Sequence, residues 1–267
     1  MAVPIWHTQV RDGVRLACAD YGGEGAAAIL VHGLAGYARE WDETAAWLVG
    51  SHRLAAVEQR GHGRSERRPQ DLSRQAFVDD LAAWIDVLGL APAVVIGQSL
   101  GAHTAFLLAA QRPELVRALV VAEATPDADP DGPRQVREWL ESWPIPFAGR
   151  GQALAHFGDT TWGRAWTDGL ERRQDGLWPA FDTEVMVAAL DELAGRSYWD
   201  EWSRIACPTF VVRGESGGVG GEGAARMVRA LPCARAATIA GAGHDVHLDQ
   251  PSRWQEAVEG FLATLAR

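Results

Sequence analysis

Ser99 is the residue of this chain best placed to act as a nucleophile. It lies at the centre of the sequence Gly-Gln-Ser-Leu-Gly, after an apolar run at residues 93–96 and before a helical pattern at residues 102–111. Glycines on both sides allow the sharp strand-to-helix turn that holds a serine hydroxyl above a sheet. The dipole of the following helix favours negative charge that develops there. The pattern predicts a nucleophilic serine, with an ordinary turn between strand and helix as the alternative.

His244 is the candidate for the general base that a serine nucleophile needs at neutral pH. It ends the sequence Gly-Ala-Gly-His, which directly follows a predicted strand at residues 234–240. The small residues before it leave room for the imidazole to reach the serine. His247, three residues later, is the competitor, and we expect it to brace the segment that follows. The alternative for His244 is a loop histidine with a structural role.

A third segment, His32-Gly33-Leu34, follows the predicted strand at residues 27–31. A backbone N–H of this segment, that of Leu34, would form an oxyanion hole with the N–H of Leu100, which follows the serine. We expect His32 to anchor the loop by hydrogen bonding rather than to take part in chemistry. The alternative is a simple glycine turn.

Short apolar runs alternate with longer helical patterns over most of the chain, after an N-terminal hairpin predicted at residues 3–10 and 14–21. The runs are continuously apolar, as in parallel strands covered on both faces and joined by right-handed crossovers. The predicted strands are residues 27–31, 53–57, 93–96, 116–122, 209–213 and 234–240, and the predicted helices are residues 40–48, 72–88, 100–111, 224–231 and 252–265.

The alternation stops after residue 123 and resumes near residue 204. The segment between has no convincing strand, but it holds seven of the twelve tryptophans: Trp139, Trp143, Trp162, Trp166, Trp178, Trp199 and Trp202. We therefore predict a core formed by residues 1–125 and 204–267, with a helical cap at residues 126–203. The tryptophans are expected to form an apolar roof over Ser99, because aromatic side chains dominate pocket linings. The alternative is that they hold the cap together.

Four segments resemble, in order, the signatures of the α/β-hydrolase family: His32-Gly33, the sequence Arg-Gly-His-Gly-Arg-Ser at residues 60–65, the serine pentapeptide, and Gly-Ala-Gly-His244. The resemblance covers the whole chain apart from details of the cap. It implies an α/β fold with a mostly parallel twisted sheet, helices on both faces and an inserted helical cap. It also implies that the base comes last in chain order and that residues 60–65 form a structural loop. Glu58, where relatives often carry Asp, is given no catalytic role.

The acid of the catalytic triad is the point at which this sequence departs from the family. Relatives most often place it shortly after the strand that follows the cap, but here glycines follow Glu215. In a second arrangement, the acid ends the strand before the cap, which in this chain is Glu123. A carboxylate at the end of an apolar strand is costly unless it is paired, and the imidazole of His244 would supply the partner. We choose Glu123, followed by Glu215 and then Glu222, while a capping role for Glu123 is the alternative.

No cofactor and no metal ion are expected. Residues 218–223 fit the glycine pattern of a dinucleotide site, but no acidic residue ends the next predicted strand, and the pattern lies late in the chain. The histidines lack metal-ligand spacing. The three cysteines, Cys18, Cys207 and Cys233, form no Cys-x-x-Cys pair, which argues against a disulfide framework or a zinc site.

Size and charge limit the classes of protein further. A chain of 267 residues with 47% apolar content is long enough for one large α/β domain or two small ones. A net charge of −10 argues against nucleic acid or an anionic membrane as a partner. Because no signal peptide or membrane-spanning run is found, we predict a cytoplasmic protein. The expected partner is a small hydrophobic substrate, and a homodimer remains open.

These residues predict a serine hydrolase that cleaves a hydrophobic or aromatic carboxylic ester or lactone through an acyl-enzyme on Ser99, in the manner of carboxylesterases and lactonases. Two alternatives use the same triad: a C–C bond hydrolase, and a cofactor-free perhydrolase or haloperoxidase. A third is a non-catalytic ligand receptor of the same fold. The serine disfavours epoxide hydrolase and haloalkane dehalogenase chemistry, for which family members use Asp at this position.

Overall fold

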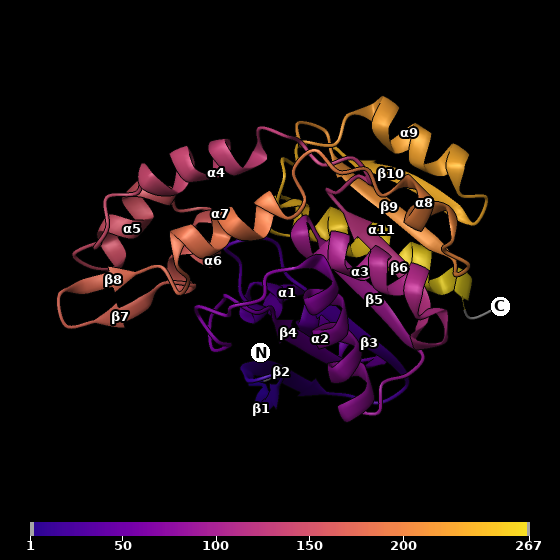
Figure 1. The fold of residues 1–267 in the computed structure, drawn as a ribbon, viewed down its shortest axis with the longest axis horizontal. Coiled ribbons are helices and arrows are strands. Elements are labelled where there is room, and N and C mark those ends of the chain that lie inside the picture. The colour runs from indigo at the N-terminus through magenta and orange to yellow at the C-terminus, as the bar shows by residue number, and fades with distance from the viewer. Residues whose placement is uncertain (1–2, 266–267) are drawn as a thin grey trace.

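An eight-stranded, mostly parallel sheet organises the computed structural model, which describes residues 3–265 (Figure 1). The strand order is β1-β2-β4-β3-β5-β6-β9-β10, and only the pairs β1–β2 and β2–β4 are antiparallel. This confirms the predicted sheet. The strands are β1 (Ile5–Arg11), β2 (Val14–Gly22), β3 (Ala26–Val31), β4 (His52–Glu58), β5 (Ala93–Gln98), β6 (Val116–Ala122), β9 (Thr209–Gly214) and β10 (Ala234–Ile239).

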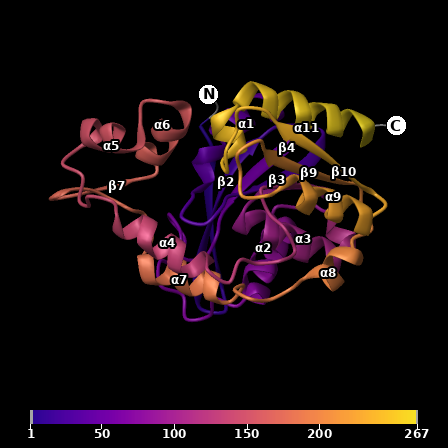
Figure 2. The same ribbon diagram turned by 90° about the horizontal axis from the view of Figure 1, so that it is seen from above.

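Helices cover both faces of the sheet, as Figure 2 shows from above. Successive strand residues point to opposite faces: in β5, Val95 packs on one side, whereas Val94 and Ile96 pack on the other. Burial on both faces explains why the strands are continuously apolar. One face carries α2 (Arg74–Val87), α3 (Leu100–Gln111), α8 (Trp199–Ser203) and α9 (Gly221–Ala230), and the other carries α1 (Asp42–Leu48) and α11 (Pro251–Leu265).

The segment between β6 and β9 extends away from the sheet and is mostly helical (Figures 1 and 2). Its last helix, α8, returns to the sheet, where Trp202 is fully buried and donates its indole N–H to the carbonyl of Met227. Its other elements are α4 (Gly132–Glu141), α5 (Arg150–Phe157), α6 (Thr161–Asp168), β7 (Glu171–Arg173), β8 (Gly176–Trp178) and α7 (Thr183–Asp191).

The hairpin formed by β7 and β8 corrects the expectation that this segment contains no strand. Each strand has three residues, which is too short to show an alternating pattern. The local signal was the Asp175-Gly176 pair: Gly176 has a φ of 147°, a conformation that glycine adopts readily. Within residues 3–265, no helix combines the length and apolar character needed to cross a membrane.

The turn between β5 and α3 brings Ser99 to the carboxyl edge of the sheet. Ser99 has a φ of 51°, in the left-handed region. The start of α3 passes so close to the end of β3 that a Cβ on Gly101 would collide with the carbonyl oxygens of Val31 and His32. Glycine is therefore required at this position by the packing of helix against strand.

Replacing Gly101 with Ala should destabilise the protein by about 1–3 kcal/mol, because the added methyl group meets backbone atoms that cannot move independently. Gly260→Ala is the matched control: a Cβ there meets nothing within 4 Å, and in α11 alanine should stabilise by up to about 1 kcal/mol. Urea unfolding followed by tryptophan fluorescence gives both free energies. Equal changes for the two variants would contradict this account of the turn.

Candidate active site

The structure brings Ser99, His244 and Glu123 together in one cavity of about 300 Å³. Ser99 follows β5, Glu123 follows β6, and His244 lies in the loop after β10. The carboxyl ends of parallel strands meet at one edge of a sheet, which is where ligands bind in open α/β sheets. Residues from three distant parts of the sequence therefore face the same space.

Glu123 lies behind His244, with its Oε2 3.2 Å from the imidazole Nδ1. The carboxylate is fully buried and accepts three backbone N–H groups, from Gly214 at 2.7 Å, Gly218 at 2.7 Å and Val219 at 3.2 Å. These partners explain how an acidic residue is tolerated at the end of an apolar strand.

The glycines after β9 have a structural reason. A Cβ on Gly217 would collide with both carboxylate oxygens of Glu123, so the loop can pass this close to the carboxylate only with glycine at that position. Glycine thus occupies the region where relatives often carry the acid, and it makes room there for an acid from the neighbouring strand.

The two rival acids lie away from the imidazole. Glu215 is exposed and accepts the backbone N–H of Gly241 at 2.9 Å, and Glu222 pairs with Arg229. Of the three candidate acids, only Glu123 is hydrogen-bonded to His244.

The competing base, His247, is buried and removed from Ser99's cavity. Its ring stacks on Trp41 at 4.0 Å between ring centroids, and its Nε2 lies 3.4 Å from Oε1 of Glu40. These contacts confirm the expectation that His247 braces the segment after His244.

His244 has a raised pKa. Burial lowers this pKa, but the hydrogen bond with Glu123 and the negative charges of Asp245, Glu123 and Asp249 outweigh burial. The side chain keeps 52% of its surface exposed. With its Nδ1 proton donated to Glu123, the neutral imidazole presents Nε2 as an acceptor, the form that a general base requires.

Two buried histidines hold the loop that would form the oxyanion hole. His32 donates from Nδ1 to the carbonyl of Gly33 at 2.7 Å and accepts the backbone N–H of Gln59 at 3.1 Å. His62 accepts the backbone N–H of Ala35 at 3.0 Å. Burial lowers the pKa of His32 well below its ordinary value and that of His62 to about 4, so both rings are neutral. The anchoring predicted for His32 is confirmed.

The loop that carries Leu34 passes beside the serine, and Leu100 directly follows the serine, although Leu34 itself does not line the cavity. A Cβ on Gly33, next to Leu34, would lie 3.3 Å from the Cβ of Ser99, so this loop runs along the serine. Leu100 is the first residue of α3 and lines the cavity, and its N–H belongs to the free first turn of that helix. Leu34 and Leu100 remain our predicted donors.

The tryptophan roof expected over Ser99 is not found, since the described residues that line the cavity include no tryptophan. Trp139, Trp143 and Trp166 instead pack edge to face on one another, with ring centroids 5.1–5.7 Å apart. The packing matches the alternative, in which the tryptophans hold this segment together.

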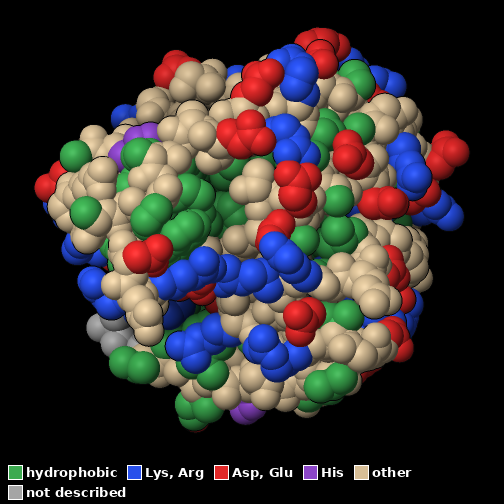
Figure 3. Space-filling model, turned by 60° about the vertical axis from the view of Figure 1, so that its left-hand side comes forward, with side chains coloured by type: hydrophobic (Ala, Val, Ile, Leu, Met, Phe, Trp, Pro, Cys, Tyr) green, Lys and Arg blue, Asp and Glu red, His purple; other side chains and the backbone are tan. Residues whose placement is uncertain are grey.

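A second cavity, of about 680 Å³, lies between α6, the β7–β8 hairpin and the sheet, and neither Ser99 nor His244 lines it. Figure 3 shows this end of the molecule, where arginine side chains form a band below a hollow of hydrophobic side chains. Two arginines near the hairpin are paired, Arg67 with Glu171 and Arg68 with Asp182. The chemistry-bearing residues thus lie in the smaller cavity.

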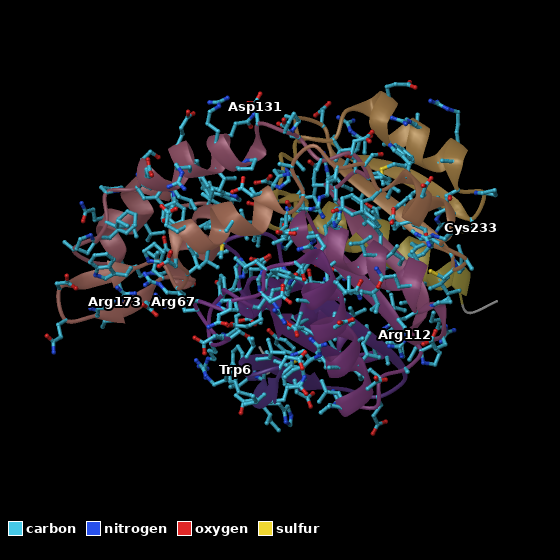
Figure 4. All side chains as sticks on the ribbon, viewed as in Figure 1. Trp6, Arg67, Arg112, Asp131, Arg173 and Cys233 are labelled. Atoms are coloured by element: carbon cyan, nitrogen blue, oxygen red, sulfur yellow. The ribbon has the colours of Figure 1, made fainter. Side chains whose placement is uncertain are left out.

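Residues 3–265 contain no group of three His, Cys, Asp or Glu side chains able to hold a metal ion. Cys233 is exposed and lies at the opposite end of the molecule from the β7–β8 hairpin (Figure 4). In the glycine-rich sequence at residues 218–223, the N–H groups of Gly218 and Val219 are already donated to Glu123.

A family model of the alpha/beta hydrolase fold matches residues 28–251. The chain belongs to this family. It is 30% identical to an esterase, Rv0045c, of Mycobacterium tuberculosis over 91% of this chain and 85% of that protein. It is 28% identical to the sn-1-specific diacylglycerol lipase ABHD11 of Mus musculus, over 89% and 81%.

Among solved structures, E-2-(acetamidomethylene)succinate hydrolase superposes with a TM-score of 0.88 at 22% identity, over 97% of this chain and 99% of that one. At this identity, the likeness concerns the fold. Together with the family match, the relatives support a hydrolase of the α/β-hydrolase fold.

Glu123→Gln should lower the pKa of His244, because it removes the negative charge and leaves only a neutral amide oxygen as acceptor. Glu215→Gln, which changes an acid that does not contact the imidazole, is the control. A histidine whose pKa is raised on folding stabilises the protein below its ordinary value of 6.5, and this contribution is lost as pH rises through the raised pKa.

Histidine NMR titration of the wild type and the two variants measures this difference directly. If the pKa of His244 fell only in Glu215→Gln, the assignment of Glu123 as the acid would be wrong.

Proposed function

We propose that this protein is a serine hydrolase that cleaves an uncharged, hydrophobic carboxylic ester or lactone through an acyl-enzyme on Ser99. The observation that carries the proposal is the hydrogen bond between the buried Glu123 carboxylate and His244, in the cavity that Ser99 lines. The family membership and the esterase and lipase relatives support it.

In the proposed mechanism, Nε2 of His244 accepts the proton of Ser99 as Oγ attacks the substrate carbonyl. The backbone N–H groups of Leu34 and Leu100 stabilise the oxyanion. His244 then protonates the leaving alcohol, and an acyl group remains on Ser99. Water, deprotonated by His244, attacks the acyl carbon and regenerates the serine. Glu123 holds the imidazole in the required tautomer and stabilises the imidazolium form.

The lining of the cavity supports an apolar substrate. Most of its lining surface is apolar, and the apolar side chains that contribute include Leu100, Pro133, Leu190, Leu193 and Val219. A volume of about 300 Å³ suits a small molecule at the lower end of ordinary ligand pockets.

Charge at the same cavity disfavours an anionic substrate. Asp127 and Asp129 line it, and its described lining includes no arginine. Asp127 is paired with Arg226 at 3.0 Å. Asp129 accepts hydrogen bonds from the backbone of Asp131 and from Gln135 and has no basic partner among residues 3–265, so its charge remains uncompensated.

Ser99→Ala should abolish hydrolysis of p-nitrophenyl butyrate by a folded protein, with kcat reduced by roughly 10⁴-fold or more because the attacking oxygen is absent. Burst kinetics and mass spectrometry of the wild type should show one butyryl group on Ser99. Activity that survives in Ser99→Ala would disprove the assigned nucleophile. Peroxide-dependent halogenation, cleavage of a vinylogous diketone, or binding without turnover would instead support one of the alternative functions.

A neutral ester should be hydrolysed with a higher kcat/KM than an ester of the same length that carries a free carboxylate, such as the mono-p-nitrophenyl ester of succinic acid. Asp129 should repel that carboxylate. Asp129→Asn should narrow the ratio between the two substrates at low salt. Asp131→Asn, on the neighbouring exposed acid, is the matched control. Equal kcat/KM values of the wild type for the two substrates would show that charge at the cavity does not select against an anionic substrate.

A further inference from the structure

The carboxylate of Asp245, next to the general base in sequence, joins three parts of the molecule. Its Oδ2 accepts the indole N–H of Trp162 at 2.6 Å and that of Trp166 at 3.3 Å. Its Oδ1 accepts the side-chain N–H of Gln98 at 3.2 Å. Hydrogen bonds to an ionised acceptor are stronger than neutral ones, so these contacts fix the carboxylate on both sides.

Gln98, one residue before the nucleophile, extends the connection into the site. Its side-chain N–H also donates to the carbonyl of His244 at 3.0 Å. Its Oε1 lies so close to Gly33 that a Cβ there would collide with it. The buried side chain of Gln98 therefore contacts the serine turn, the histidine loop and the predicted oxyanion loop.

On the other side of Asp245, the two tryptophans that donate to it belong to α6. Trp162 and Trp166 are four residues apart and so lie on one side of that helix. Their rings belong to the aromatic cluster around Phe157, with Trp162 and Trp166 each within 6.3 Å of its ring centroid. The N–H groups point out of this cluster to Asp245, which is the place where α6 meets the short helix α10 (Val246–Asp249) that follows His244.

We propose that Asp245 is a positioning residue: it fixes the His244 loop to the serine turn through Gln98 and to the cap through Trp162 and Trp166, so that the placement of the cap and of the general base are coupled. The inference rests on the proposed function. Asp245 does not line Ser99's cavity, so it acts through its neighbours rather than on the substrate. A displacement of the base of about 1 Å is enough to lower the rate by roughly 100-fold.

The charges around His244 give this role a specific signature. Glu123, Asp245 and Asp249 all raise the pKa of His244, while Asp245 also faces the buried Glu40 and Asp249. Since only the neutral imidazole accepts the serine proton, kcat/KM should rise with pH through this pKa. Removal of the Asp245 charge should shift that rise to lower pH.

The test compares the wild type with Asp245→Asn, with the double variant Trp162→Phe and Trp166→Phe, and with Trp178→Phe as control. The control also removes an indole N–H from a carboxylate, that of Asp175 at 2.9 Å, but on the hairpin. The rate at which a fluorophosphonate labels Ser99 should fall roughly 10- to 100-fold in the first two and stay unchanged in the control. In Asp245→Asn, the pH profile should also shift.

Hydrogen–deuterium exchange in residues 241–250 of the double variant provides a readout independent of activity, with faster exchange expected there than in the control. If fluorophosphonate does not label the wild type, the proposed function is disproved. The exchange rates then still test whether the cap and the His244 loop are coupled. A labelled wild type with unchanged labelling, pH profile and exchange in the variants disproves the inference alone. Faster exchange with unchanged labelling also overturns it, because the contact would then be structural only.

Discussion

The buried carboxylate of Glu123 is the interaction on which this site depends. An isolated ionised carboxylate inside a protein costs several kcal/mol, and the structure supplies three backbone N–H groups and the imidazole of His244 as partners. Those partners come from the end of β9 and from the loops after β9 and β10, whereas the acid itself follows β6. Satisfying one charge therefore gathers three strand ends, and it leaves His244 facing the cavity that Ser99 lines.

The same backbone conformation places the nucleophile and the acid at this edge of the sheet. Ser99 and Glu123 follow the neighbouring strands β5 and β6, and each has a φ of 51°. A left-handed conformation costs a non-glycine residue about 1–3 kcal/mol. In both cases the backbone N–H still continues the sheet, from Ser99 to Ala122 and from Glu123 to Val212, before the chain turns. The sheet thus over-determines the two positions that chemistry requires to be rigid.

Much of this arrangement could be predicted from the sequence, because it follows from short-range patterns. Strand β6 and helix α3 begin and end at the predicted residues, since a continuous apolar run and a glycine-flanked turn mark them locally. The choice between Glu123 and Glu215 was different in kind. It depends on a 3.2 Å contact between residues 121 positions apart and on a glycine loop shaped to fit a side chain from another strand. The position of Glu123 at the end of an apolar strand favours it in the sequence, but no spacing there contains the contact itself.

The tryptophans show why the segment between β6 and β9 was predicted less well. Composition predicts that seven large rings will be buried together, but it does not say which surface they cover, since they bury one another as readily as they line a pocket. Most buried N–H groups have an acceptor, so the partner of an indole N–H shows where a ring is held. For Trp162 and Trp166 that acceptor is Asp245, about 80 residues away and beside the base. The polar atom of the ring, more than its apolar surface, connects this segment to the site.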